Sequence, residues 1–277
     1  MINIIKSDLF RLFKGKGIYI IITLIIGFSI INAYSISPIH IGLNMTENKF
    51  SYGLDEEWSE KLYDSRSLAE TREILLNHGD FKADIVSLAQ NNVIYYFMIA
   101  IVVIILSTDF SCNTIKNSIS TNISRKKYYF SKLLLSLGIG TILLFSYSYI
   151  SYFMYLLIDG DKVVTSFLNI TLLVARQLPL LYGIISLLVT ISLLTRKTAV
   201  FNTITIPLLM IMQVIFIGCI NLFDLPTKLC DFEFEAALGK LCINYSNTYM
   251  LQLTVIWTCI MAISCLIGYK FFEKKDI

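Results

Sequence analysis

The stretch LLLSLGIGTILLFSYSYISYFMYLLI, residues 133–158, decides the fold of this chain. It holds no charged side chain and exceeds the roughly 20 apolar residues that an α-helix needs to cross the hydrocarbon layer of a membrane. Five similar stretches lie on either side of it, at 18–37, 93–107, 178–194, 201–220 and 250–269. With 56% hydrophobic and 16% charged residues overall, the sequence predicts an all-α integral membrane protein with six transmembrane helices.

The distribution of charge predicts the orientation of these helices. If the N-terminus is cytosolic, the inner segments carry 14 basic and 4 acidic residues, a sum of +10. The outer segments then carry the other 9 basic and 16 acidic residues, a sum of −7. Since Lys and Arg are enriched in cytoplasmic loops, both the N- and the C-terminus are predicted to lie in the cytosol.

Residues 1–16 precede the first apolar stretch and predict an amphipathic interfacial helix. A helical stripe joins Ile2, Ile5, Leu9, Leu12 and Phe13, whereas Asp8, Arg11 and Lys14 lie away from it. Such a helix can lie on the inner membrane surface with its apolar side among the acyl chains. A disordered basic tail is the alternative.

Two longer segments are predicted to be extracellular loops, at 38–91 and 221–248. The first contains a predicted helix at 55–76 with an acidic excess, which fits either a solvated surface or the binding of a cationic ligand. The second contains a predicted amphipathic helix around 231–238, and it holds Cys230 and Cys242. A disulfide between them would close a short loop on the outer side, and two reduced thiols are the alternative.

The sequence contains none of the common motifs of enzymes that bind and hydrolyse nucleotides or that hydrolyse peptides or esters. It has no G-x-x-x-x-G-K-[ST] phosphate loop, no H-E-x-x-H, no G-x-S-x-G and no C-x-x-C. Its two histidines, His40 and His78, lie in the first outer loop without partners at metal-ligand spacing. We therefore expect no catalytic residue, no metal site, no cofactor bound by this chain and no nucleic-acid partner.

No charged residue occupies the central part of any predicted span, which disfavours an ion-coupled carrier. Arg176 lies at the outer end of the fourth span, where it either contacts cargo or anchors the helix at the interface. Tyr149 and Tyr152 belong to a tyrosine-rich third span and either line a path for cargo or serve helix packing. These three residues are the candidates for a cargo path.

A polar and basic segment at 110–131 separates the second and third spans on the cytosolic side. Ile115, Ile119 and Ile123 recur every fourth residue, so a short helix there would present one apolar ridge. Such a ridge fits a groove on a cytosolic partner. The cations and aromatics at 125–130 are predicted to hold the segment at the headgroup layer. The alternative is that these cations only fix the topology.

Two stretches resemble the permease subunits of type-2 ABC transporters, in particular the bacterial group of lantibiotic-immunity and bacitracin-type export permeases. They are SDLFRLFK at 7–14, before the first span, and NTIKN at 113–117 with ISRKKYY at 123–129 and SK at 131–132, after the second. The resemblance implies a coupling helix docked on a separate ATPase. The residues assigned to that contact are Thr114, Ile115, Lys116, Ile119, Ile123 and Arg125.

The resemblance also implies a function and partners. The chain would be a single permease domain, 1–277, in a bacterial cell membrane, paired with a second copy or a paralogue. A cytosolic ABC ATPase would bind ATP and magnesium, and the cargo would be an amphipathic compound such as an antimicrobial peptide. A non-transporting sensor or scaffold and an ion-coupled carrier are the alternative functions.

Overall fold

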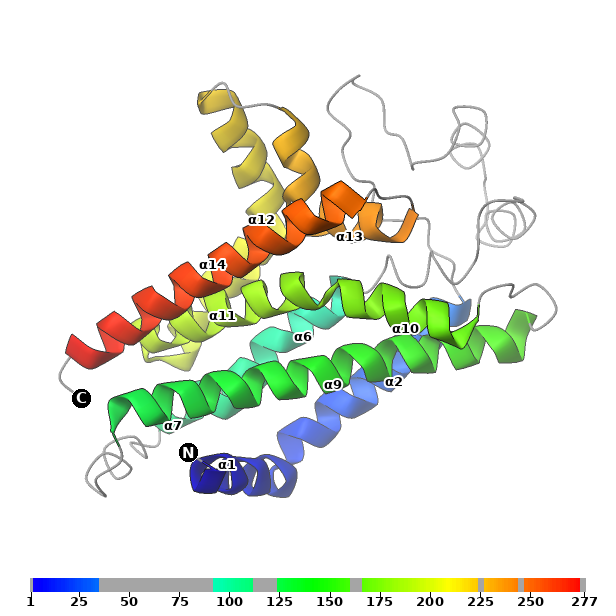
Figure 1. The fold of residues 1–277 in the computed structure, drawn as a ribbon. Coiled ribbons are helices and arrows are strands. Elements are labelled where there is room, and N and C mark those ends of the chain that lie inside the picture. The colour runs from blue at the N-terminus through cyan, green and yellow to red at the C-terminus, as the bar shows by residue number, and fades with distance from the viewer. Residues whose placement is uncertain are drawn as a thin grey trace.

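The computed structural model describes residues 2–34, 92–111, 124–159, 166–223, 227–243 and 247–274, and these are helical almost throughout (Figure 1). The elements are α1 (Ile2–Lys14), α2 (Lys16–Tyr34), α6 (Asn92–Val102), the π-helical turn η1 (Val103–Ser107), α7 (Thr108–Ser111), α9 (Arg125–Asp159), α10 (Phe167–Arg176), α11 (Leu178–Thr195), α12 (Thr198–Leu222), the 3₁₀-helix η3 (Thr227–Phe232), α13 (Phe234–Ile243) and α14 (Asn247–Lys274). The predicted helical class is confirmed for these residues.

Within the described residues, three helices are long and apolar enough to cross a membrane, namely α9, α11 and α14. The number rises to five if each of two bent pairs is one span: α1 with α2, bent by 68°, and the two halves of α12, bent by 63° between Met212 and Val214. All six predicted stretches fall on helices as far as the structure describes them. The stretch 93–107 forms a shorter apolar helix, Val93–Leu106, whose last turn is the π-helical turn η1.

The long helix α9 begins earlier than the third predicted span. It starts at Arg125, so the last third of the segment 110–131, predicted as a loop, is the first part of a helix. Tyr128, Tyr129 and Lys132 are buried there. These side chains pack against neighbouring helices, which explains why the helix extends beyond the apolar run. The location of residues 125–130 at the headgroup layer stays a prediction.

Helix α11 lies at the centre of the molecule and packs most extensively against α14, and also against α9, α6 and α12. The α11–α14 contact is close because Gly183 has no side chain. A Cβ atom at this position would lie 2.4 Å from the Cε3 atom of the buried Trp257 ring. The indole plane therefore rests directly on the backbone of α11.

Helix α1 occupies its predicted place before the first span, but most of its apolar stripe packs against the protein. Leu12 is buried and Ile5 and Leu9 pack against the same core, whereas Phe13 of that stripe is exposed. Asp8 is buried as well. The exposed aromatic side chain of Phe10 lies outside that stripe. Helix α1 contacts α9 and η1 at the end of the molecule where both chain termini lie (Figure 1), which we call the terminal end.

Candidate functional site

A cluster of four charged side chains joins three elements at the terminal end. Asp8 and Arg11 come from α1, Asp109 from α7 and Lys132 from α9. Asp8, Asp109 and Lys132 are only 7%, 3% and 1% exposed, which is unusual for ionisable residues unless they are paired. We call these four residues the charge cluster; it holds two acids and two bases and is therefore neutral as a unit.

Lys132 is the centre of the charge cluster. Its Nζ atom lies 2.7 Å from Oδ1 of Asp8 and 2.5 Å from Oδ2 of Asp109, and it donates to the carbonyl oxygen of Ile105 at 3.2 Å. An ammonium group has three N–H donors, and each of these three acceptors comes from a different element. The single cation thereby connects α1, α7 and η1 to α9.

Arg11 reinforces the same contacts from the partly exposed side. Its Nη1 atom pairs with Oδ1 of Asp109, and its Nη2 atom donates to the Ile105 carbonyl at 3.2 Å and lies 3.4 Å from Oδ1 of Asp8. The Ile105 carbonyl belongs to the π-helical turn, where the regular α-helical hydrogen-bond ladder is interrupted. Two cations therefore converge on this one backbone oxygen.

The carboxylate of Asp109 is held in its charged form by these contacts. Burial by itself raises the pKa of Asp109, but the charge and hydrogen bond of Lys132, together with hydrogen bonds from Tyr128 and Arg11, outweigh that effect. The net result is a pKa below the ordinary value of 3.8. Tyr128 contributes by donating its hydroxyl proton to Oδ2 at 2.6 Å. Asp109 is consequently an anion at neutral pH.

The cluster brackets the segment predicted to couple to an ATPase. Asp109 lies three residues before residue 112, and α9 begins at Arg125, shortly after residue 123. Thr114, Ile115, Lys116, Ile119 and Ile123 all fall within 112–123, outside the described residues, so their assignment stays a prediction. Any displacement of that segment would pull on α7 and α9, and the charge cluster joins both of these to α1.

Arg125, the remaining residue of the predicted coupling set, contacts the last helix of the chain. Its Nη1 atom donates to the carbonyl oxygen of Glu273 at 2.6 Å and to that of Phe272 at 3.4 Å. A cation at this position satisfies terminal carbonyls and complements the helix dipole. One turn further along α9, the ring of Tyr128 stacks on Phe272 with centroids 5.7 Å apart. Arg125 thus secures α14 to the start of α9.

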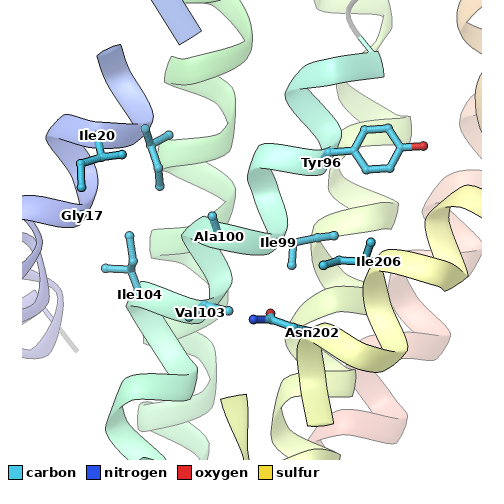
Figure 2. A pocket seen from close by; sticks show the side chains of 10 residues that line it. Gly17, Ile20, Tyr96, Ile99, Ala100, Val103, Ile104, Asn202 and Ile206 are labelled. Carbon is cyan, nitrogen blue, oxygen red and sulfur yellow. The ribbon is translucent and has the colours of Figure 1, made fainter. Parts of the chain in front are cut away.

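An apolar pocket of about 510 Å³ lies between α2, α6, η1 and α12. Figure 2 shows Gly17 and Ile20 of α2 across from Ala100 and Ile104. Its full lining is Gly17, Ile20, Ile21, Tyr96, Ile99, Ala100, Val103, Ile104, Asn202 and Ile206. The amide of Asn202 enters from α12 (Figure 2), and its Oδ1 atom is buried without a hydrogen-bond partner among the described residues. The pocket therefore suits an apolar group.

The π-helical turn links the pocket to the charge cluster. The side chains of Val103 and Ile104 line the pocket, and the carbonyl of the next residue, Ile105, accepts hydrogen bonds from Lys132 and Arg11. Turns of this kind are common at functional sites because they interrupt a regular helix locally. A shift of Lys132 or Arg11 would therefore act on a wall of the pocket through one peptide group.

The residues predicted to form a cargo path lie elsewhere, where α9 meets α10. The Tyr149 hydroxyl lies 3.2 Å from Oγ1 of Thr171, and its ring is 4.8 Å from that of Phe167. Tyr152 is buried and contacts the same Phe167 ring at 6.2 Å. Arg176 ends α10. None of the three lines the pocket, so the structure does not bring them together with it, and their role in a cargo path stays a prediction.

The other site predictions remain at the level of the sequence. Cys230 lies in η3 and Cys242 in α13, but their side chains are outside the described part of the structure. The first outer loop, 38–91, is outside it too. Among the described residues, no group of three or more His, Cys, Asp or Glu side chains could hold a metal ion.

The charge cluster and the pocket were not recognised from the sequence. In the sequence, Asp8, Asp109 and Lys132 are among the charges that predict the topology, and Asp8 and Lys132 belong to the stretches that carry the resemblance, but their pairing was not predicted. A signal was nevertheless present, because Lys132 stands between YYFS and LLLSL, and only Ser107 and Thr108 separate Asp109 from the long apolar run that ends at Leu106. A charge enclosed by apolar sequence on both sides needs a partner. The pocket had no such signal, since it depends on how three helices pack.

Comparison with known proteins adds no identification. No protein-family model matches the chain, and no curated protein matches it. The functional argument therefore rests on the residues and on their geometry.

Proposed function

We propose that this chain is the membrane-spanning permease subunit of an ATP-binding cassette transporter, and that it expels an amphipathic compound such as an antimicrobial peptide from a bacterial cell membrane. A separate cytosolic ATPase would bind ATP and magnesium and supply the energy. The proposal starts from the sequence resemblance at 7–14, 113–117 and 123–132, and it is strengthened by the arrangement of the charge cluster.

The observation that carries the proposal is the connection through the π-helical turn. Lys132 joins α1, α7 and α9 at the bases of the segment 112–123, and it also holds the carbonyl of Ile105. Ile104, the adjacent residue, lines the apolar pocket. A force applied to the segment by an ATPase therefore has a short mechanical route to a cavity, which is what a permease without its own nucleotide site requires.

The shape of the pocket supports an amphipathic cargo. Its lining is apolar apart from Asn202 and the hydroxyl of Tyr96, and its volume of about 510 Å³ accommodates a few large side chains or part of an acyl chain. An apolar side chain of a peptide that has entered the bilayer fits such a lining.

A second permease, either another copy or a paralogue, would complete the assembly. Large apolar side chains of α12 and α14 are exposed, including Met210, Val214, Leu251 and Leu266. In a membrane such side chains face either lipid or another helix bundle. The working unit would then contain two permeases and two ATPases, as the resemblance implies.

The decisive experiment is co-purification of the chain with its candidate ATPase from membranes. Ile119→Asp places a charge on the predicted apolar ridge, and it should abolish both co-purification and the permease-dependent stimulation of ATP hydrolysis. Ser120→Asp is the matched control, because it adds the same charge beside the ridge, and it should retain both. If Ile119→Asp assembles and stimulates hydrolysis normally, the proposed coupling is wrong.

A second outcome separates transport from signalling. ATP-dependent release of a labelled amphipathic peptide from proteoliposomes containing both subunits supports the permease. A stable complex that responds to ligand but moves no peptide, with or without ATP, favours the sensor or scaffold. Peptide movement that needs only an ion gradient favours the ion-coupled carrier.

A further inference from the structure

A buried carboxyl group lies at the end of the molecule opposite the charge cluster. Glu233 connects η3 to α13 and is 1% exposed. Its Oε2 atom accepts hydrogen bonds from the backbone N–H groups of Glu235, at 3.0 Å, and Ala236, at 3.2 Å. It thereby caps the first turn of α13. Its Oε1 atom is buried and has no hydrogen-bond partner among the described residues.

The segment that contains Glu233 is attached to the bundle on two sides. The ring of Phe234 packs edge-on against Tyr95 of α6, with centroids 4.7 Å apart. On the other side, Tyr249 of α14 donates its hydroxyl proton to the carbonyl of Asp231 at 2.6 Å and stacks on Phe232 at 5.2 Å. These contacts hold the η3–α13 segment closed over the carboxyl group and exclude water from it.

We propose that Glu233 is a proton-controlled latch, which keeps the η3–α13 segment closed when protonated and favours its opening when ionised. The physical reason is the cost of an unpaired carboxylate in a buried site. Opening the segment exposes Oε1 to water and removes that cost. The neutral acid carries no such cost, so protonation stabilises the closed arrangement.

The titratable groups that the structure describes around Glu233 supply no hydrogen bond to its Oε1 atom. On the elements that pack against this segment, the described ones are Glu235 on α13, Asp231 on η3, Tyr95 and Tyr96 on α6, Cys219 on α12, Arg176 at the end of α10 and Tyr249 on α14. The side chains of Lys228 and Lys240 lie outside the described part of the segment. The charge of Glu235 disfavours a second anion nearby. Neither carboxylate oxygen of Glu233 has a hydrogen bond to a described cationic side chain.

Burial raises the pKa of the Glu233 carboxyl from an ordinary 4.5 to about 7. The charge of Glu235 adds to this rise, whereas hydrogen bonds from the backbone N–H groups of Ala236, Glu235 and Phe234 oppose it. The closed segment therefore binds an extra proton between these two values. Its stability is complete below pH 4.5 and falls as the pH rises to about 7. Between pH 6 and pH 8, the open fraction should rise by about tenfold.

The test measures amide hydrogen exchange in the full chain reconstituted in lipid nanodiscs. Protection factors, which divide out the intrinsic pH dependence of exchange, are compared at pH 6 and pH 8 for residues 234–243. We expect about a tenfold loss of protection in the native chain and no change in Glu233→Gln. Glu235→Gln is the matched control, because it removes a neighbouring carboxylate that is not buried to the same extent, and it should retain most of the effect.

Two results would overturn the proposal. One is protection of residues 234–243 that does not change with pH in the native chain, and this measurement stands even if Glu233→Gln fails to fold. The other is the same pH-dependent loss in a folded Glu233→Gln. Neither result bears on ATP-driven transport, since no ATPase and no cargo are present.

Discussion

The two ends of this molecule each bury a carboxylate, and they treat it in opposite ways. Asp109, at the terminal end, forms ion pairs with Lys132 and Arg11 and accepts a hydrogen bond from the hydroxyl of Tyr128. Glu233, at the opposite end, accepts hydrogen bonds from backbone N–H groups on one oxygen, and its other oxygen has no partner among the described residues. The first arrangement lowers the pKa and the second raises it. The presence of a partner cation, more than burial, decides whether the pKa of the carboxyl group is lowered or raised.

This difference gives the two carboxyl groups different roles: Asp109 holds helices together, whereas Glu233 can change its charge. Asp109 stays ionised at neutral pH because its pKa is lowered, so its contacts with Lys132 and Arg11 can transmit a displacement without being lost. A lone buried carboxyl changes charge near neutrality, so it can change its contacts. The following experiments test this contrast, in order of decreasing expected effect.

Removal of the central cation should have the largest effect. Lys132→Met leaves the carboxylates of Asp8 and Asp109 buried without their common partner, and we expect a loss of about 3–5 kcal/mol in the free energy of unfolding. Denaturant unfolding in lipid micelles measures it. Lys127→Met is the matched control, because that side chain is exposed, and it should change stability little. Equal effects of the two substitutions would show that the cluster does not stabilise the fold.

Overpacking the middle of the bundle should have the next largest effect. In Gly183→Ala the new Cβ atom would lie 2.4 Å from the Trp257 ring, so the α11–α14 contact must separate. We expect a cost of about 1–3 kcal/mol, with the near-ultraviolet circular dichroism of Trp257 changed as well. Gly138→Ala is the control, since nothing lies within 4 Å of its added Cβ atom. A native Trp257 signal in Gly183→Ala would contradict the packing.

Acidification should lower the stability of α1 at the terminal end and should not lower that of α13 at the opposite end. The lowered pKa of Asp109 gives stability that is complete above its ordinary value of 3.8 and is lost as the pH falls below it. Amide protection of α1 should therefore decrease below about pH 4, while that of α13 stays high. Asp109→Asn should remove the acid dependence of α1. Loss of protection at both ends together would indicate global unfolding instead.

The smallest expected effect concerns one hydrogen bond of the η3–α13 segment. Tyr249→Phe removes the donor to the Asp231 carbonyl and keeps the ring that stacks on Phe232. We expect a loss of about 0.5–1.5 kcal/mol, visible as faster exchange of α13 amides at a fixed pH. Tyr182→Phe, on α11, is the control and should leave α13 unchanged. An unchanged α13 in Tyr249→Phe would show that this hydrogen bond does not hold the segment.

Helix positions were predictable because they depend on local composition. The run 133–158 has no charged residue and forms part of α9, and the pattern at 1–16 forms α1. Boundaries were less predictable. The start of α9 at Arg125 depends on the burial of Tyr128, Tyr129 and Lys132 against other helices, and no local pattern reports that burial. The π-helical turn at Val103–Ser107 has no apolar period that distinguishes it from an ordinary helix.

The sequence by itself determined that the chain is helical and apolar enough to cross a membrane several times, because hydrocarbon-length apolar runs exclude other backbone arrangements. It also showed which charges interrupt those runs. Only the tertiary structure decided what these charges do. Lys132 has two carboxylate partners because α1 and α7 meet α9. Glu233 is a carboxylate without a described cationic partner, since no described cation reaches its Oε1 atom. Electrostatic energy depends on distances through space, and distances between helices are not written in any local pattern.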